Sequence, residues 1–326
     1  MSRTLGASGP VVSSLGLGLA ALGRPGYITL GHGEDLGGDR SVEAMERQAH
    51  AVLDAAYQSG IRYLDAARSY GRAEAFLASW LTSRGLRPED VVVGSKWGYA
   101  YTADWRVNAE RHEVKDHSLP HLRKQWEESR VLLGPWLRLY QVHSATFESG
   151  VLEDRGVLEE LGRLRDSGVR MGLTLSGPRQ AEVLRRALEL RVGGSPVFSC
   201  VQATWNLLER SAGPALAEAH AAGWGVIIKE AVANGRLTAR NEDPALKALH
   251  ELAEALGASV DAVALAAVLA QPWVSVVLSG ASTVEQLQSN VRALEVKLGA
   301  EALERLRGLV ESPDVYWAQR AALPWN

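Results

Sequence analysis

The sequence predicts a (β/α)8 TIM barrel, in which eight parallel strands form a closed ring surrounded by helices. Short runs of β-branched and aliphatic residues alternate along the chain with longer amphipathic runs, which is typical of βαβ units in a parallel sheet. Eight strand-like runs occur, the number that closes this kind of barrel. The length of 326 residues is normal for such a barrel with insertions, so we expect a single domain over residues 1–326.

The predicted elements follow one another in a regular order. An N-terminal β-hairpin is expected over residues 3–12, ahead of the first barrel strand. The barrel strands are expected at 15–19, 62–65, 91–96, 137–143, 169–175, 200–204, 226–229 and 274–278. Between them, apolar residues recur every three or four positions, as helices that pack on a sheet require. These helices are expected at 42–58, 73–82, 117–133, 157–166, 180–190, 212–221, 245–256 and 284–294.

Two long loops and the C-terminal tail depart from a minimal barrel. The segment 97–116 after the third strand carries Trp97 and Tyr99, and its aromatic content argues against disorder. The segment 23–40 after the first strand is rich in glycine and carries Tyr27. Both segments follow the carboxyl ends of strands, the face where TIM barrels build their sites. We therefore expect Trp97, Tyr99 and Tyr27 to line a substrate pocket there.

Composition excludes several classes of function. The formal charge of −3, from 35 basic and 38 acidic side chains, provides no field for nucleic acid or for an anionic membrane. Cys200 is the only cysteine, which excludes an internal disulfide and a thiolate metal cluster and fits a reducing compartment. The start of the chain has no apolar signal-like run, and no stretch approaches the length that spans a bilayer. We expect a cytoplasmic protein that acts on a small molecule and uses no metal.

Four polar residues stand at the carboxyl ends of predicted strands or shortly after them. Asp65 and Tyr70 lie in YLDAARSYG, Lys96 in VVVGSKWG and His143 in LRLYQVHSA. Each one alone is more often structural, as a loop cap, a core tyrosine, a snorkelling lysine or a hydrogen-bonded core histidine. Because the carboxyl ends of barrel strands meet at one face, we interpret the four together as a candidate active site.

These four side chains could act together as a proton donor. A tyrosine has an unperturbed pKa of about 10, so it is a poor acid at neutral pH until a neighbouring ammonium stabilises its phenolate. Lys96 could supply that charge, and Asp65 could keep the lysine charged and in place. The neutral imidazole of His143 could hold a substrate carbonyl against the phenol of Tyr70.

One motif points elsewhere and is rejected on its context. Residues 16–21 read GLGLAA, which fits the G-x-G-x-x-A fingerprint of Rossmann dinucleotide sites. That fingerprint needs a helix directly after the glycines, so that the helix N-terminus meets the pyrophosphate. Here GRPG follows and prevents a helix. We expect these glycines to permit tight packing at a strand end instead.

The order of these motifs resembles that of the aldo-keto reductase superfamily. The shared pattern is D-x-x-x-x-Y-G at Asp65 to Gly71, then a strand ending in Lys96, then one ending in His143. It continues through LGLGLAALG, GVRMGLTLSG, VQATWNLL and SGASTVEQLQSN, and so covers nearly the whole chain. The resemblance implies an NAD(P)H-dependent oxidoreductase that reduces aldehydes, ketones or sugars to alcohols by direct hydride transfer. In it Tyr70 donates the proton, Lys96 lowers the pKa of the phenol, Asp65 supports Lys96, and His143 orients the carbonyl.

The resemblance also implies a site for the nicotinamide. Ser176 and Gln202 stand where the family holds the carboxamide, although Gly177 replaces the usual asparagine after the serine. Lys229 stands near the position of the tyrosine that commonly stacks on the nicotinamide, so that aromatic contact is lost. Lys229 and Glu230 could pair with each other or contact the pyrophosphate.

A further segment resembles the part that holds the adenosine half of the cofactor. Residues 283–286 have the spacing of a capping box, and a helix N-terminus favours phosphate. The positions that the resemblance assigns to this half are Gly280, Ala281, Ser282, Gln286 and Asn290, with Gly235 and Arg240 in the loop after the seventh strand. Residues 280–290 contain no Arg or Lys to meet a 2′-phosphate, but Arg240 stands where relatives carry a basic residue. The sequence therefore favours NADP(H) and leaves NAD(H) open.

The resemblance leaves two other functions open. One is an NAD-dependent sugar or alcohol dehydrogenase that works in the oxidative direction. The other is a nucleotide-binding redox sensor or scaffold of low turnover, as the potassium-channel β subunits of this superfamily illustrate. Turnover of several aldehydes without a partner protein would separate the enzyme from the scaffold. Substrate identity and oligomeric state are not specified by these motifs.

Overall fold

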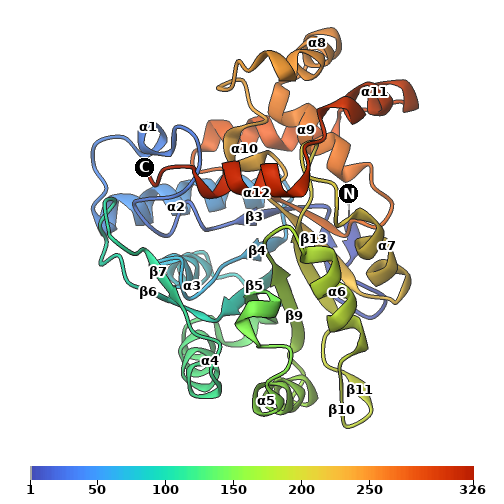
Figure 1. Cartoon of the computed structure of the whole chain (residues 1–326). Coiled ribbons are helices and arrows are strands. Elements are labelled where there is room, and N and C mark those ends of the chain that lie inside the picture. The colour runs from blue at the N-terminus through green and yellow to red at the C-terminus, as the bar shows by residue number, and fades with distance from the viewer. Residues whose placement is uncertain (1) are drawn as a thin grey trace.

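The structure is a computed structural model that describes residues 2–326, and it contains the predicted closed barrel (Figure 1). Eight parallel strands follow one another around the ring in chain order, and β14 pairs with β3 to close it. The strands are β3 (Leu15–Gly18), β4 (Tyr63–Asp65), β5 (Val92–Trp97), β8 (Leu137–Ala145), β9 (Arg170–Leu175), β12 (Cys200–Thr204), β13 (Gly225–Lys229) and β14 (Val276–Ser279). Each strand begins and ends close to its predicted bounds, so the strand prediction is confirmed.

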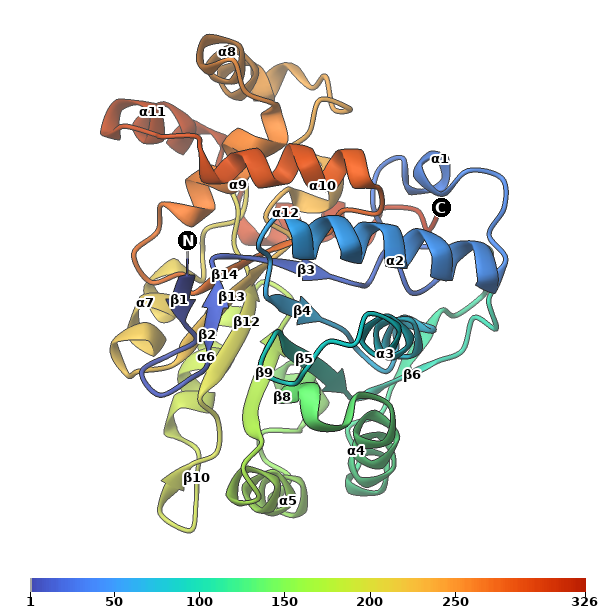
Figure 2. The same ribbon diagram turned by 180° about the vertical axis from the view of Figure 1, so that it is seen from behind.

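The predicted helices surround the barrel (Figures 1 and 2). They are α2 (Val42–Gln58), α3 (Ala73–Ser83), α4 (Leu119–Leu133), α5 (Arg155–Asp166), α6 (Gln180–Glu189), α7 (Gly213–Ala221), α8 (Lys247–Leu256) and α10 (Val284–Val291). Helix α4 begins later than predicted because Ser118 caps it, its hydroxyl accepting a hydrogen bond from the backbone N–H of His121 at 3.4 Å. Local capping, which periodicity does not encode, therefore sets this boundary.

Helix α9 (Val260–Leu269) is the largest element that the sequence did not predict. Its sequence VDAVALAAVL has almost no polar face, and eight of its ten residues are buried. A helix that is apolar all round gives no three-to-four periodicity, which is why the pattern misses it. It packs against α8, α10 and β14, and so contributes to the outer core.

Short elements organise the segments that were predicted as loops and tail. The loop after β3 contains α1 (His32–Leu36), and the loop after β5 folds back as a hairpin of β6 (Tyr99–Tyr101) and β7 (Glu113–Lys115). The remaining pieces are the hairpin β10 (Arg191–Val192) and β11 (Ser195–Pro196), the tail helices α11 (Ala300–Arg305) and α12 (Pro313–Ala321), and the 3-10 turns Gly134–Trp136, Phe147–Ser149, Ala233–Gly235, Pro244–Leu246, Arg292–Leu294 and Leu306–Leu309. Both views place the C-terminus beside α1 (Figures 1 and 2).

Alternate residues of each strand point into the barrel, and this interior is densely filled. A Cβ on Gly16 would lie 2.9 Å from the Tyr63 ring and 2.9 Å from Val276. A Cβ on Gly94 would lie 2.4 Å from the Tyr63 hydroxyl. Gly16 therefore leaves room for neighbouring side chains, as expected of the rejected fingerprint. The inward residues become polar toward the carboxyl ends of the strands, at Asp65 and Gln202.

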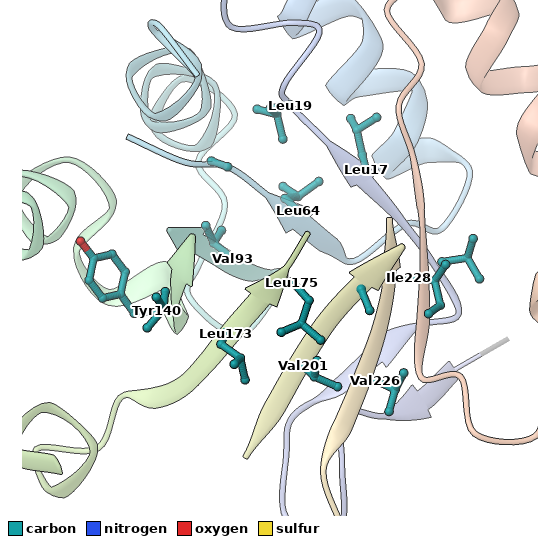
Figure 3. Packing of buried hydrophobic residues seen from close by; sticks show 14 of the residues in the cluster. Leu17, Leu19, Leu64, Val93, Tyr140, Leu173, Leu175, Val201, Val226 and Ile228 are labelled. Atoms are coloured by element: carbon teal, nitrogen blue, oxygen red, sulfur yellow. The ribbon is translucent and has the colours of Figure 1, made fainter. Parts of the chain in front are cut away.

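The other strand residues pack outward against the helices. Figure 3 shows this layer, in which Leu64, Val93 and Leu173 project from β4, β5 and β9. All three are at most 1% exposed. At about 25 cal/mol per Å² of buried apolar surface, this layer is the main source of fold stability, and it holds the strand ends in fixed positions.

The predicted N-terminal hairpin is present and covers the floor of the barrel. Strand β1 (Ser2–Thr4) pairs antiparallel with β2 (Val11–Ser13). Leu5, in the turn that follows β1, is fully buried, and a Cβ on Gly225 would lie 2.8 Å from its side chain. The floor is thus sealed, and the open end of the barrel is the end where the strands finish.

Within residues 2–326, no single helix has both the length and the apolar character needed to cross a bilayer. One bent pair, Pro244–Leu256 with Val260–Leu269, meets the criterion on length and composition when its two helices are taken together. Most residues of α9 are buried inside the protein, as in the core helix of a folded domain.

Candidate active site

A cavity of about 370 Å³ lies at the carboxyl ends of the strands. Asp65, Tyr70 and His143 line it, and Lys96 lies beside them with 1% of its surface exposed. The structure therefore brings together the four residues that the sequence placed at strand ends. Loops, the β6–β7 hairpin and the C-terminal tail form the remaining walls.

Asp65 and Lys96 form a buried ion pair between neighbouring strands. Strand β4 ends at Asp65, which pairs with Gly94 of β5. Lys96 lies two residues further along β5 and points to the same side as Gly94, so the side chains of Asp65 and Lys96 meet inside the barrel. The Lys96 ammonium donates to Asp65 Oδ2 and to the backbone oxygen of Ala66, the latter at 2.9 Å. Both side chains are at most 3% exposed, so each charge depends on the other for its stabilisation.

Three further donors fix the Asp65 carboxylate. Its Oδ1 atom accepts hydrogen bonds from the Tyr63 hydroxyl at 3.2 Å, from Gln141 Nε2 at 3.3 Å and from Gln202 Nε2 at 3.0 Å. These donors come from β4, β8 and β12, so the carboxylate connects strands across the barrel. A carboxylate that accepts several hydrogen bonds is held in one orientation.

Tyr70 is positioned by a tight turn after β4. Its backbone N–H donates to Ala67 O at 3.1 Å. The next residue, Gly71, has φ of +59°, and a Cβ there would lie 2.4 Å from Gly23 O. The glycine of the Y-G pair is therefore required by the backbone conformation and by the close approach of the first loop. The Lys96 ammonium lies 4.6 Å from the centre of the Tyr70 ring.

The pKa of Tyr70 is raised well above its ordinary value. Burial is the largest cause, and the negative charge of Asp65 adds to it, while Arg24 opposes it. The contribution of Lys96 to this pKa, which the resemblance implied, stays a prediction, because burial and Asp65 set the net direction. At neutral pH the phenol of Tyr70 carries its proton, as a proton donor must before reaction.

His143 is neutral and is directed by a bulge. Burial, followed by the positive charges of Lys96 and Arg24, lowers the pKa of His143 well below its usual value. The register between β8 and β9 shifts after Val142, and Ser144 has φ of +52°, a conformation rare outside glycine. Bulges of this kind re-aim side chains beside active sites. The imidazole centre lies 5.4 Å from that of the Tyr70 ring.

Three buried histidines make stability depend on pH. The pKa values of His32 and His117 are lowered to about 4, mainly by burial, and that of His143 is also lowered. Below pH 6.5 the unfolded chain binds protons at these sites and the native chain does not, so stability is lost as pH falls. We expect the free energy of unfolding to drop by about 3 kcal/mol between pH 6.5 and 5.5, about 1 kcal/mol for each group. Urea unfolding at both pH values measures this, and equal stability would contradict it.

The prediction of the residues that line the substrate pocket is corrected at one position. Tyr27 and Tyr99 line the cavity, but Trp97 does not. Strand β5 continues through Trp97, so this side chain points to the opposite side from the inward Lys96. Trp97 is fully buried in the outer core, where its ring meets His117 edge-on at 5.5 Å.

Arg24 is a site residue that the sequence reading missed. It is 3% exposed and lines the cavity, with its guanidinium carbon 5.1 Å from the centre of the Tyr70 ring. Its Nη1 atom donates to Ser69 O at 3.2 Å and to Glu113 Oε2 at 3.0 Å. An arginine in the loop after the first strand was visible in the sequence, but its inward direction depends on the path of that loop.

The tail closes over the cavity. Trp325 stacks on His112 of the hairpin, with ring centres 3.8 Å apart. The side chain of the last residue, Asn326, accepts from Gly33 N at 2.8 Å and donates to Thr29 O at 3.0 Å. These contacts tie the tail to the loop after β3, consistent with the position of the C-terminus in Figure 1.

A second buried ion pair anchors the tail helix. Arg320 of α12 donates through two nitrogens to Glu230, which follows β13. Lys229 donates to Thr204 Oγ1 at 2.8 Å and to Glu230 Oε1 at 3.5 Å. Burial raises the pKa of Glu230, but the charges of Arg320 and Lys229 outweigh it and lower the pKa to about 2. Burial lowers the pKa of Lys229 to about 8. Lys229 and Glu230 do pair, as one alternative proposed, but the tail arginine is the closer partner of Glu230.

Replacing Arg320 by alanine is expected to cost about 3 kcal/mol of stability, the lower end of the range for breaking a buried ion pair, because Lys229 remains. The double variant Arg320→Ala/Glu230→Gln should recover part of this loss, since no buried carboxylate is then left uncompensated. Urea unfolding of both variants beside the unaltered chain measures the effect. An alanine variant as stable as the unaltered chain would show that the pair does not anchor the tail.

Backbone strain is concentrated beside the cavity. Glu230, Ala233 and Asn234 have φ of 55°, 49° and 55°, and each such residue costs about 1–3 kcal/mol. They belong to the loop after β13 that contains Gly235. The backbone N–H of Leu30 donates to Asn234 O at 3.1 Å, which joins this loop to the loop after β3. Residues in such conformations cluster at functional sites in proteins.

The residues assigned to the cofactor lie along one groove. Ser176, Gln202, Lys229, Glu230, Gly235 and Gly280 line the first cavity. A second cavity of about 220 Å³, which we call the distal cavity, is lined by Gly235, Arg240, Gly280, Ala281, Gln286 and Asn290 among others. The two cavities share Thr29, Val232, Gly235 and Gly280, so they form one elongated groove. Ser282 is buried behind it and lines neither cavity, although its backbone N–H donates to Gln286 Oε1 at 2.9 Å.

Comparison with known proteins agrees with this geometry. The chain is 27% identical over 305 residues to "Uncharacterized oxidoreductase YrpG" from Bacillus subtilis, covering 83% of this chain and 90% of the relative. It is 28% identical over 304 residues to "Probable aryl-alcohol dehydrogenase AAD4" from Saccharomyces cerevisiae, covering 81% and 88%. The solved "aldo-keto reductase AKR11C1 from Bacillus halodurans (holo form)" has the same fold, with a TM-score of 0.70 over 95% of this chain and 96% of that one at 23% identity. The sequence model of the Aldo/keto reductase family matches residues 15–311, and the chain therefore belongs to that family.

Proposed function

We propose that this chain is an NAD(P)H-dependent enzyme that reduces aldehyde, ketone or sugar carbonyls to alcohols, with Tyr70 as the proton donor. Membership of the family supports the carbonyl-reducing class. One observation supports the residue assignment most strongly. Tyr70 and His143 line the same cavity, beside the buried Lys96–Asp65 ion pair. A protonated phenol, a neutral imidazole and a buried ammonium are the components that protonation of a developing alkoxide requires.

The groove fits a nicotinamide dinucleotide. Such a cofactor is longer than a single substrate, and the two cavities share a continuous lining from Tyr70 to Asn290. Gln202 uses its Nε2 atom on Asp65, which leaves its side-chain oxygen as an acceptor for a carboxamide N–H. Ser176 would add a hydroxyl at the same end, and Lys229 a positive charge for the pyrophosphate. When bound there, the cofactor supplies the hydride.

Side chains of the protein would orient the substrate and supply the proton. The Ser69 hydroxyl lies 3.4 Å from His143 Nδ1. With Ser69 donating to Nδ1, the proton of the neutral ring lies on Nε2, which can then hold the substrate oxygen. Tyr70 passes its proton to that oxygen as negative charge develops there. The Lys96 ammonium, 4.6 Å from the Tyr70 ring, stabilises the phenolate that results.

The test of this function is steady-state turnover. The purified chain, with no partner protein, should oxidise a reduced nicotinamide cofactor in the presence of aromatic aldehydes, ketones or aldoses. Turnover of one or more of these classes would favour the enzyme over a redox sensor or scaffold. Nucleotide binding without turnover of any of these carbonyls would favour the sensor.

A second candidate is the same chemistry run toward oxidation. Hydride transfer is reversible, and one relative carries the name aryl-alcohol dehydrogenase. Comparing the rates of aldehyde reduction and alcohol oxidation at one pH would show which direction is faster. We also propose that the chain works as a single catalytic domain in the cytoplasm, to which the lone, fully buried Cys200 is suited.

A further inference from the structure

The distal cavity has little positive charge for a phosphate. Among its lining residues, Arg240 is a cation and Asp261 a carboxylate. Asp261 accepts a hydrogen bond from Asn290 Nδ2 at 2.7 Å, and Asn290 in turn accepts from the Ser279 hydroxyl at 2.7 Å. The cavity wall is therefore built from neutral donors and acceptors around one opposite-charge pair.

The charge of Arg240 is already taken up by Asp35. This aspartate lies in α1, in the loop after β3, and only 7% of its side chain is exposed. Arg240 donates to it through both terminal nitrogens, the Nη1 bond being 3.0 Å, and Nη1 also donates to Leu30 O at 2.9 Å. A two-nitrogen contact of this kind fixes the guanidinium in one orientation.

Two more side chains contact the Asp35 carboxylate, and one of them, Gln286, lines the distal cavity. Gln286 Nε2 donates to its Oδ2 at 2.7 Å, and the Ser282 hydroxyl lies 3.5 Å from the same atom. Thus Asp35 binds donors of both Arg240 and Gln286, while the Ser282 hydroxyl has its shorter contact, 3.1 Å, with Gln286 Oε1. Arg240 and Gln286 line the distal cavity, so a phosphate at this end of the groove would have to use them.

The backbone of the loop is shaped for this contact. Gly31 has φ of +74°, and a Cβ there would lie 2.2 Å from Arg240 Nη1. The close approach of the guanidinium therefore requires glycine at this position. The loop is held from the other side by the Asn326 side chain, which accepts from Gly33 N at 2.8 Å, and by Arg40, which donates to Gly33 O at 2.9 Å. Asp35 is thus placed by several anchors.

From these contacts we propose that Asp35 makes the distal cavity selective for an adenosine without a 2′-phosphate, so that the chain uses NAD(H) in preference to NADP(H). The proposal rests on the proposed function, which places the adenosine half in this cavity. It reverses the preference that Arg240 suggested in the sequence. A phosphate monoester carries about −1.5 to −2 charges at neutral pH and would meet a guanidinium whose charge is already paired with Asp35. A ribose diol can donate its hydroxyls to acidic residues, as in other NAD sites.

Titration of the tryptophan fluorescence with NADH and NADPH tests this selectivity. The chain has ten tryptophans that can report binding. The unaltered chain should bind NADH at least about tenfold more tightly than NADPH, which is 1.4 kcal/mol. Asp35→Asn removes the charge and keeps the shape, so NADPH should bind at least about tenfold more tightly than before while the Kd of NADH changes little. Retained NADH binding also shows that the variant is folded, and Asp35→Ser is a second variant if the first does not fold.

Two controls make the result specific. Glu34→Gln removes the same charge from an exposed neighbour on α1 and should leave the ratio of the two Kd values unchanged. Adding Arg240→Ala to Asp35→Asn should abolish the gain in NADPH binding, because the released guanidinium is then missing.

Equal or tighter binding of NADPH by the unaltered chain would overturn the proposal, as would an Asp35→Asn variant whose two Kd values shift by the same factor. In both cases the proposed function would stand. Failure of the unaltered chain to bind either nucleotide would instead reject the proposed function, and this inference with it.

Discussion

Replacing Tyr70 by phenylalanine is expected to lower kcat by about 10²- to 10⁴-fold, the usual contribution of a positioned general acid. The phenol is the group in the cavity that carries a proton at neutral pH and lies against both His143 and the Lys96 ammonium. Phenylalanine keeps the ring contacts with Arg24 and His143 but has no proton to give. Steady-state turnover and fluorescence titration together measure the effect, and the Kd of the cofactor should change by less than about twofold.

Tyr99 provides a matched control for this experiment. It lines the same cavity, and its ring centre lies 4.9 Å from that of His143. Tyr99→Phe removes an equivalent hydroxyl, yet it should retain most of kcat because Tyr99 is not assigned to proton transfer. If Tyr70→Phe turned over as fast as Tyr99→Phe, Tyr70 would not be the acid.

Replacing Lys96 by methionine should have the largest effect on stability, with a loss of about 3–5 kcal/mol. The substitution fills a similar volume but leaves the Asp65 carboxylate, at most 3% exposed, without its cation. Turnover should also fall, because no ammonium then stabilises the phenolate of Tyr70. Urea unfolding and turnover of the same preparation measure the two effects.

The double variant Lys96→Met/Asp65→Asn separates stability from chemistry. It removes both charges, so it should regain much of the lost stability, since replacing a whole buried pair is often nearly neutral. Turnover should stay low, because the phenolate still lacks its cation. A double variant that regained full turnover would contradict the role of the Lys96–Asp65 pair.

Periodicity was sufficient to predict the barrel. Asp65, Lys96 and His143 stand where apolar runs stop, at or within two residues of the observed strand ends, and a closed parallel barrel brings such ends to one face. The sequence therefore predicted which side chains would share a cavity. The Y-G pair was also readable, because Gly71 has a positive φ that glycine adopts readily.

Features that depend on the path of a loop were not predictable in this way. Trp97 was expected in the pocket, but one further residue of strand β5 turned its side chain to the outer core. Arg24 and Arg320 reach the cavity from a loop and from the tail, and no periodicity encodes their directions. Helix α9 (Val260–Leu269) lacks a polar face, so the pattern that marks surface helices is absent from it.

Whether the charge of Arg240 is free to bind a ligand could not be predicted from the sequence either. In the sequence it is an isolated basic residue after the seventh strand, and it suggested a phosphate site. In the structure its guanidinium is bound by Asp35, which lies 205 positions earlier in the chain. A contact over that separation has no local signature, yet it decides whether the charge is available to a ligand.

Transfer of deuterium from a labelled cofactor tests the central claim most directly. The cofactor, dideuterated at C4 of the nicotinamide, is used to reduce an aldehyde in ordinary water, and the alcohol is analysed by mass spectrometry and NMR. Direct hydride transfer predicts one deuterium on the carbinol carbon and an ordinary proton on the oxygen. A product whose carbinol carbon carries no deuterium would contradict direct transfer and, with it, the role assigned to this cavity.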